Sequence, residues 1–216
     1  MPAVMIDGPA GRLEARYHPG KRPEAPLAVV LHPHPLHGGT MANRIVYALF
    51  DAFAKRGCAV VRFNFRGVGL SHGDFGHGDG EQEDAEAVLN WLAHAHPRAA
   101  ASWVAGFSFG SWIGLRLVAA HPTLSGFIAV APPVNLYDFG FLHPCRVSGL
   151  IVQGDQDDLV PEPPVTALAQ RLETQPGIRV DYRRIAGADH FFGEHMPDLI
   201  ALAEDYLDHS LYAPDD

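Results

Sequence analysis

One serine lies in a sequence context typical of a covalent nucleophile. Ser108 is the centre of the pentapeptide GFSFG, with a glycine two residues before it and another two residues after it. Such glycines let backbone segments pass closely around a sharp turn that presents the hydroxyl at the end of a strand. The apolar run SWVAG precedes this turn, and SWIGLRLVAAH, which has helical spacing, follows it. We therefore expect a strand-to-helix turn at which the Phe109 N–H stabilises an oxyanion.

A histidine and a group of aspartates follow the serine in the order that such a nucleophile requires. His190, in GADHFF after the last predicted strand, is placed to accept the serine proton. An aspartate from GDQDDLVP, after another buried run, would orient the imidazole. Two glycines around a serine also recur by chance in a chain with 22 glycines. The order Ser, Asp, His nevertheless favours the catalytic interpretation.

Three aspartates compete for the role of the acid. Asp157 is favoured because it is the third residue after the strand's closing glycine and is followed shortly by Leu, Val and Pro, which anchor the loop. Asp155 is an alternative that would instead bond to the turn backbone, and Asp158 is a third candidate. Among the 13 histidines, His195 is a weaker candidate for the base, because the pattern places it in the final helix.

The segment HPHPLHGG, residues 32–39, offers a second backbone donor. Pro33 and Pro35 have no N–H, so His34 supplies the only backbone donor between them, and we expect it to complete the oxyanion site. Three histidines at this spacing also suggest a metal site. We disfavour that interpretation because the prolines hold the chain extended and no HExxH or CxxC motif accompanies them. The expected chemistry therefore uses neither a metal nor a cofactor.

A second loop, RFNFRGVGLSHGDFG, is rich in glycine and follows the next apolar run. It lies at the same predicted edge of the sheet as the serine turn. We interpret it as a structural turn in which Arg66 is an ion-pair partner.

Alternating strands and helices must position these residues. Apolar runs typical of strands buried on both faces occupy residues 27–32, 58–65, 102–108, 126–132 and 147–154, and a last strand is predicted at 178–187. Helical spacing is found at residues 42–56, 81–95, 110–121, 161–174 and 194–209. The alternation predicts an α/β fold with a doubly wound, mostly parallel sheet, helices on both faces and ligands at the carboxyl ends of the strands. Before it, VMIDGPAGRLEARYH predicts an antiparallel hairpin with a turn at Asp7 and Gly8.

Composition limits the classes of protein to which the chain can belong. The 216 residues, 47% hydrophobic, suit a single domain over 1–216, and no patch for self-association stands out. A formal charge of −9 disfavours nucleic acid and anionic membranes as partners. No run approaches the ~18 apolar residues of a membrane span, and the N-terminus does not resemble a secretion signal. Cys58 and Cys145 lie beside apolar runs, so we expect buried free thiols and a cytoplasmic location.

The motifs HPHPLHGG, NFRGVGLSHG, GFSFG, GDQDDLVP and GADHFF, in that order, resemble those of the small, lidless bacterial α/β-hydrolases, which include dienelactone-hydrolase-like and esterase-like proteins. The resemblance spans nearly the whole chain. It implies Ser108 as nucleophile, Asp157 as acid, His190 as base, and the amides of Phe109 and His34 as oxyanion donors. Dienelactone hydrolases use a cysteine where this chain has serine, which argues against their lactone activity.

The chain differs from the lidded members of that superfamily. Only VNLYDFGFLHPCR separates two of the predicted strands, which is too short for a lid, so we expect an open site. Phe107, Phe139 and Phe191 are expected to contact an apolar acyl or aryl group there. Aromatic side chains more often fill a core, so burial of these residues is the competing interpretation.

The activity implied is hydrolysis of a carboxylic ester or thioester through an acyl-enzyme, with a small-molecule ester as the partner. A serine peptidase or amidase would use the same residues on a poorer leaving group. A noncatalytic binding protein with this fold is a third interpretation, which an intact set of Ser, Asp and His disfavours.

Overall fold

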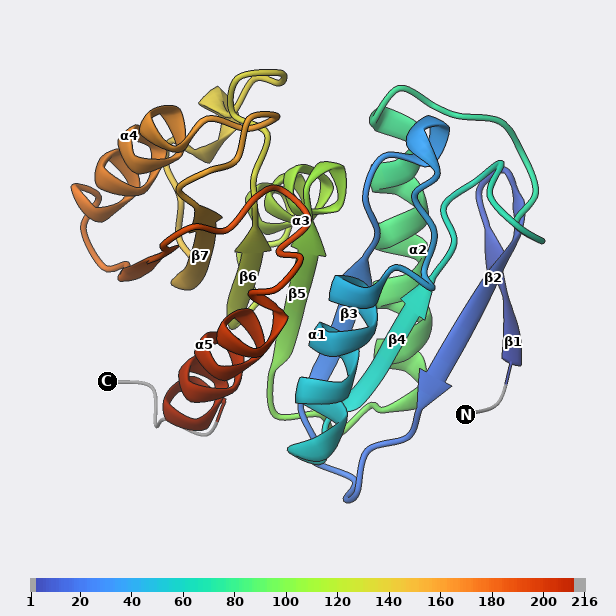
Figure 1. Cartoon of the computed structure of the whole chain (residues 1–216). Helices are drawn as coiled ribbons and strands as arrows, with labels where there is room; N and C mark the ends of the chain where they lie inside the picture. The colour runs from blue at the N-terminus through green and yellow to red at the C-terminus, as the bar shows by residue number, and fades with distance from the viewer. Residues whose placement is uncertain (1–2, 212–216) are drawn as a thin grey trace.

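The computed structural model describes residues 3–211, which form an eight-stranded sheet with helices on both faces (Figure 1). The strand order is β1-β2-β4-β3-β5-β6-β7-β8. The two N-terminal strands pair antiparallel with each other, and β2 pairs antiparallel with β4; these three are β1 (Ala3–Gly8), β2 (Gly11–His18) and β4 (Ala59–Phe63). All other pairs are parallel and involve β3 (Leu27–Leu31), β5 (Ser102–Phe107), β6 (Gly126–Val130), β7 (Gly149–Gly154) and β8 (Val180–Ile185). The predicted α/β-hydrolase fold, a mostly parallel sheet with an N-terminal hairpin, is confirmed.

Helices cover the two faces of the sheet in two groups. One core packs the sheet against α2 (Asp79–Ala95), α3 (Phe109–Ala120) and α4 (Glu162–Glu173). The other packs it against α1 (Arg44–Lys55) and α5 (Met196–Ser210). Each of the five predicted helices is present, with ends within two residues of the expected positions.

Strand β3 shows why the apolar runs form the middle layer. Leu27, Val29 and Leu31 belong to the core beneath α2, α3 and α4. Ala28 and Val30 belong to the core beneath α1 and α5. Because successive side chains of a strand point to opposite faces, a run without polar residues is stable only where both faces are covered.

Helix α1 begins and ends where its sequence indicates. The side chain of Asn43 accepts the N–H of Ile45 at 2.9 Å and so caps the first turn. Ile45, Leu49 and Phe53 are buried on one face, as their four-residue spacing predicts. After the helix the chain reverses at Gly57, whose φ of 84° is a conformation that glycine adopts without steric cost.

The N-terminal hairpin turns two residues later than predicted. Gly8 pairs with Gly11, so the turn consists of Pro9 and Ala10 rather than Asp7 and Gly8. Proline has a fixed φ suited to the first corner of a turn and lacks the N–H that a strand would use. The proline therefore overrides the turn preference of the Asp-Gly pair.

The connection between β6 and β7 contains no lid. Residues 131–148 hold only the short 3-10 helix η2 (Gly140–Leu142).

Both cysteines are buried free thiols, as expected, and burial raises the pKa of Cys58 to about 12. In the part of the chain that the structure describes, every helix is too short or too polar to cross a bilayer.

A buried ion pair ties the glycine-rich loop to α2. The Arg66 guanidinium donates to Asp84 Oδ1 from Nη2 at 2.8 Å and from Nε at 3.1 Å, and the Arg66 backbone N–H donates to Oδ2 at 2.9 Å. The side chain of Asp84 is fully buried and that of Arg66 is 11% exposed. Burial raises the pKa of Asp84, while the guanidinium opposes this by stabilising the carboxylate. The structural role predicted for Arg66 is confirmed.

Replacing Arg66 by methionine should leave this carboxylate buried without its counter-ion. We expect Arg66→Met to lower the free energy of unfolding by about 3–5 kcal/mol, measured by urea denaturation. The double variant Arg66→Met/Asp84→Leu removes both charges and should recover part of that loss. A single variant as stable as the wild type would contradict this account.

Candidate active site

Ser108 is the single residue between β5 and α3. Its φ of 53° and ψ of −122° place it in a region that side chains with a Cβ rarely adopt. The turn is held because the Ser108 N–H donates to the carbonyl of Val130, at the end of β6, at 2.8 Å. The Ser108 carbonyl in turn accepts the N–H of Ser111, in the first turn of α3, at 2.8 Å.

The two glycines of GFSFG are required by backbone approach. A Cβ on Gly106 would lie 2.3 Å from the carbonyl oxygen of Gly110. A Cβ on Gly110 would lie 2.4 Å from the carbonyl oxygen of Leu31, at the end of β3. Both distances are too short for real atoms, so a side chain at either position would displace the backbone. The end of β3 therefore lies directly against the turn that carries Ser108.

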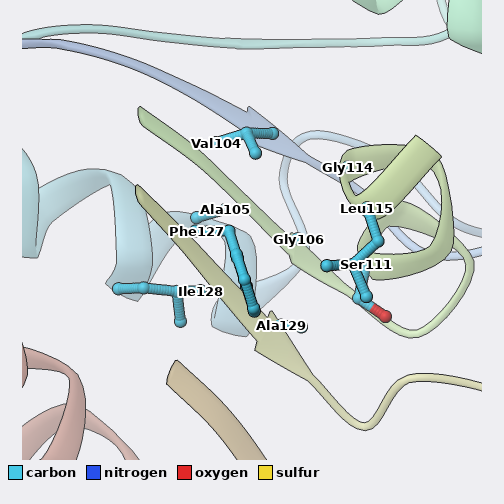
Figure 2. Close-up of a pocket in the computed structure, with 9 residues that line it drawn as sticks. All are labelled: Val104, Ala105, Gly106, Ser111, Gly114, Leu115, Phe127, Ile128 and Ala129. Carbon is cyan, nitrogen blue, oxygen red and sulfur yellow. The ribbon is translucent and has the colours of Figure 1, made fainter. Parts of the chain in front are cut away.

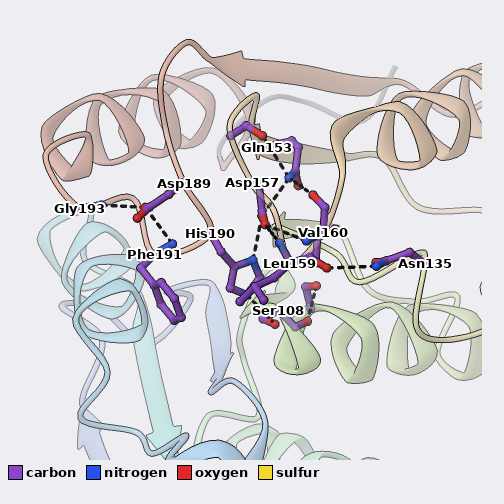
Figure 3. A network of polar contacts seen from close by, with 12 residues as sticks. Ser108, Asn135, Gln153, Asp157, Leu159, Val160, Asp189, His190, Phe191 and Gly193 are labelled. Carbon is purple, nitrogen blue, oxygen red and sulfur yellow. Dashed lines mark hydrogen bonds and ion pairs between the residues drawn. The ribbon is translucent and has the colours of Figure 1, made fainter.

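Three side chains from three loops meet at the carboxyl edge of the sheet (Figure 3). His190 Nε2 lies 3.1 Å from Ser108 Oγ, and His190 Nδ1 lies 2.8 Å from Asp157 Oδ2. Because an ionised carboxylate only accepts hydrogen bonds, Nδ1 carries the proton and Nε2 is free to accept the hydroxyl proton. His190 and Asp157 are 6% and 5% exposed.

The aspartate that contacts His190 is Asp157. Its Oδ1 accepts the backbone N–H groups of the second and third residues after it, at 2.9 and 2.7 Å. Asp155 is exposed and accepts the N–H of Gly187 at 2.8 Å, which is the turn-bonding role considered for it. Asp158 is also exposed.

Gln153, the penultimate residue of β7, is a polar contact that the sequence analysis did not identify. It is fully buried, and its Nε2 donates to Asp157 Oδ2 at 3.1 Å and to the carbonyl of Val160 at 2.8 Å. A polar residue in the otherwise apolar strand LIVQG was the signal available. Buried amides are found where they have partners, so it indicated a polar contact at this end of the strand.

Two aromatic rings pack near the imidazole of His190. The ring of His190 lies 5.1 Å from that of Phe107 and 5.3 Å from that of Phe191, between centroids. Arg44, the first residue of α1, donates to the Phe191 carbonyl at 2.6 Å and so ties this loop to the helix. His195 precedes α5 as its N-cap, whereas the sequence pattern placed it inside the helix.

Two of the three phenylalanines expected to contact substrate are buried. Phe107 is 1% exposed beneath His190, and Phe139 is 3% exposed and stacks on Phe141. Phe107 belongs to the core beneath α1 and α5, and Phe139 to the core beneath α2, α3 and α4, which matches the competing interpretation. Phe191 is 56% exposed beside His190.

The loop HPHPLHGG is held by its first histidine. His32 Nε2 accepts the N–H of Phe65 at 3.0 Å, and His32 Nδ1 donates to the Pro33 carbonyl at 2.6 Å. Burial lowers the pKa of His32 to about 4, so the neutral ring that these two contacts need is the stable form. His34 follows with a φ of −51°, and its ring lies 4.9 Å from that of Phe109. Among residues 3–211, no group of three or more His, Cys, Asp or Glu side chains is arranged to hold a metal ion.

Two hollows lie on or within the fold. Beneath the serine turn, β5, β6 and α3 pack closely around Gly106, Ser111 and Gly114 and leave no room for a water molecule (Figure 2). An open depression of about 480 Å³ lies over α2 and α3, lined in part by Trp112 and Arg116. Ser108, Asp157 and His190 line neither hollow.

The chain is similar to known proteins over its whole length. Residues 7–157 match the family model described as X-Pro dipeptidyl-peptidase (S15 family). ATU1826 of Agrobacterium tumefaciens, a protein of unknown function, is 50% identical, with 100% of both chains covered and a TM-score of 0.96. An α/β serine hydrolase homologue from Coxiella burnetii is 39% identical, with 95% of this chain and 97% of that chain covered and a TM-score of 0.86.

XC6422 from Xanthomonas campestris is described as a serine hydrolase without a lid. It is 34% identical, with 99% of this chain and 96% of that chain covered and a TM-score of 0.87. The absence of a lid in that protein agrees with the short β6–β7 connection of this chain. The chain therefore belongs to the family described as X-Pro dipeptidyl-peptidase (S15 family), and it is a lidless α/β-hydrolase of the serine hydrolase class.

Proposed function

We propose that this protein hydrolyses a carboxylic ester or thioester through an acyl-enzyme formed on Ser108. The observation that carries the proposal is the hydrogen-bonded chain from Ser108 Oγ through His190 to Asp157. Its distances match those required of a nucleophile, a general base and an orienting acid.

In the first half of the reaction, His190 Nε2 accepts the hydroxyl proton as Ser108 Oγ attacks the carbonyl carbon. The Asp157 carboxylate stabilises the imidazolium that forms. The tetrahedral intermediate then collapses, and His190 delivers the proton to the departing alcohol or thiol. Water, deprotonated by the same imidazole, attacks the acyl-enzyme to form a second tetrahedral intermediate. Its collapse breaks the bond to Ser108 Oγ, which takes the proton back from His190 as the acid departs.

The oxyanion of each intermediate would be held by two backbone amides, those of Phe109 and His34. Phe109 is the first residue of α3, and the N–H groups of a first helical turn have no acceptor within the helix. The positive end of the helix dipole also lies there. The ring contact between His34 and Phe109 supports the position of the second amide on the same side of Ser108.

Exposed apolar side chains close to these residues support a substrate with an apolar group. Phe191 follows the histidine, Leu159 lies two residues after the acid, and Leu36 lies two residues after His34; they are 56%, 54% and 67% exposed. Asn135, in the connection between β6 and β7, donates to the Leu159 carbonyl at 3.0 Å. Burial of these exposed apolar side chains by a substrate would be favourable. A small neutral ester is therefore the proposed partner.

The two buried free thiols support a cytoplasmic location.

A serine peptidase activity is the second candidate, because the family model that matches residues 7–157 is described as X-Pro dipeptidyl-peptidase. The same serine, histidine and aspartate would perform it. The difference lies in the leaving group, since an amine needs fuller protonation by His190 than an alcohol does.

Removal of the nucleophile tests the proposal directly. We expect Ser108→Ala to lower the hydrolysis of p-nitrophenyl butyrate by ~10⁶-fold, the scale for losing a catalytic serine. Mass spectrometry should locate a fluorophosphonate label on Ser108 of the wild type. Ser125→Ala, an exposed serine preceding β6, is the matched control and should retain both activity and label. Equal rates in the wild type and Ser108→Ala, with no label in either, would contradict the proposal.

The two candidate activities separate on paired substrates that share one acyl group. We expect the p-nitrophenyl ester to be cleaved with the larger kcat/KM and the corresponding p-nitroanilide slowly or not at all, because the amine leaving group needs fuller protonation by His190 than the phenol does. X-Pro p-nitroanilides belong in the same series. Faster cleavage of an X-Pro anilide than of the esters would favour the peptidase.

Replacement of His34 by proline tests the second oxyanion donor. The φ of His34, −51°, suits proline, so His34→Pro deletes the N–H with little change in the course of the chain. We expect kcat to fall by ~100- to 1000-fold relative to His34→Ala, which loses the same ring but keeps the amide. Equal kcat values for the two variants would show that this amide does not hold the oxyanion.

A further inference from the structure

We propose that Gln153 is a positioning residue that tunes the proton affinity of His190 through Asp157. The inference rests on the proposed function, because it concerns the base of that reaction. It starts from the fully buried amide that shares a carboxylate oxygen with His190.

The orientation of the Gln153 amide is determined by its surroundings. Nε2 lies 2.8 Å from the Val160 carbonyl, 3.1 Å from Asp157 Oδ2 and 3.2 Å from the Gly154 carbonyl. All three neighbours are acceptors, so the reversed amide would place an oxygen against three oxygens. An NH₂ group has two hydrogens, and the two shortest contacts assign them to Val160 and Asp157.

The two oxygens of the Asp157 carboxylate accept hydrogen bonds from different donors. Oδ1 accepts two backbone N–H groups of its own loop, which hold the carboxylate in place. Oδ2 accepts from both Gln153 and His190. A donor on Oδ2 withdraws negative charge from the oxygen that must stabilise the imidazolium. Without the Gln153 donor, more of that negative charge would be available to the imidazolium.

The polar side chains that contact His190 in the described part of the chain come from two elements. They are Asp157, from the β7–α4 loop, and Ser108, from the turn before α3. Aromatic rings from β5 and from the histidine loop pack on the imidazole. Arg44 of α1 reaches this loop only through the Phe191 carbonyl.

The carbonyl oxygen of the Gln153 side chain makes an unfavourable contribution to folding. Oε1 is buried and has no hydrogen-bond partner among the residues described. An unpaired buried carbonyl is unfavourable for folding, whereas an apolar side chain of the same shape would avoid that penalty. What glutamine adds to β7 is the pair of N–H donors, one of them to Asp157.

The pH dependence of kcat/KM tests the role with variants of similar size. Gln153→Met removes the donor, so the carboxylate should hold the imidazolium more strongly and the acid limb of the profile should move to higher pH, by about 0.5 unit or more. Gln153→Leu also removes the donor and should move it in the same direction. Gln175→Met removes another buried glutamine, which bonds to Cys145 and Leu142 in the segment preceding β7, and should leave the midpoint unchanged.

A midpoint unchanged in both Gln153 variants, whatever their kcat or stability, would show a merely structural residue and overturn the inference. A shift to lower pH would overturn it as well. Failure of the proposed function is recognised separately, because the wild type would then take no fluorophosphonate label and cleave no ester. Two variants of different shape keep the test available when one of them folds poorly, and urea denaturation reports that independently.

Discussion

The close approach of the Leu31 carbonyl to Gly110 is the constraint on which the rest of the site depends. It brings the end of β3 against the first turn of α3 at a distance that excludes any side chain. Strands β3 and β5 are parallel neighbours, so their carboxyl ends lie at the same edge of the sheet. The contact between the Leu31 carbonyl and Gly110 fixes the distance between the end of β3 and the first turn of α3. The strained backbone of Ser108 and the loop carrying His34 are both positioned by it.

Two buried carboxylates show how one residue type takes two roles in this fold. Asp84 faces the Arg66 guanidinium, which also donates to Glu83, and these contacts stabilise the glycine-rich loop. Asp157 faces an imidazole whose other nitrogen faces Ser108. Both carboxylates accept several N–H groups, which is what allows a buried charge to persist. The two aspartates therefore differ in what their partner contacts: the imidazole beside Asp157 also contacts Ser108, whereas the guanidinium beside Asp84 does not.

The short β6–β7 connection determines how substrate would reach the serine. In the described part of the chain, residues 131–148 between β6 and β7 form only a short 3-10 helix, and the apolar side chains of Leu36, Leu159 and Phe191 remain exposed. The burial of Phe107 and Phe139 makes them support for the imidazole and the core instead. A substrate would therefore complete a partly open site rather than enter a closed one, in keeping with the lidless relatives.

Apolar periodicity predicts the strands, the helices and the parallel sheet, because it records how each segment is buried. The sequence also indicates Ser108 and His190, since their motifs are local and follow strands that end at one edge, and spacing favours Asp157 over Asp155 and Asp158. The contact of Asp157 with His190, the burial of Phe107 and the donation from Gln153 to Asp157 are seen only in the folded chain. They depend on the packing of side chains from different elements, which local motifs do not specify.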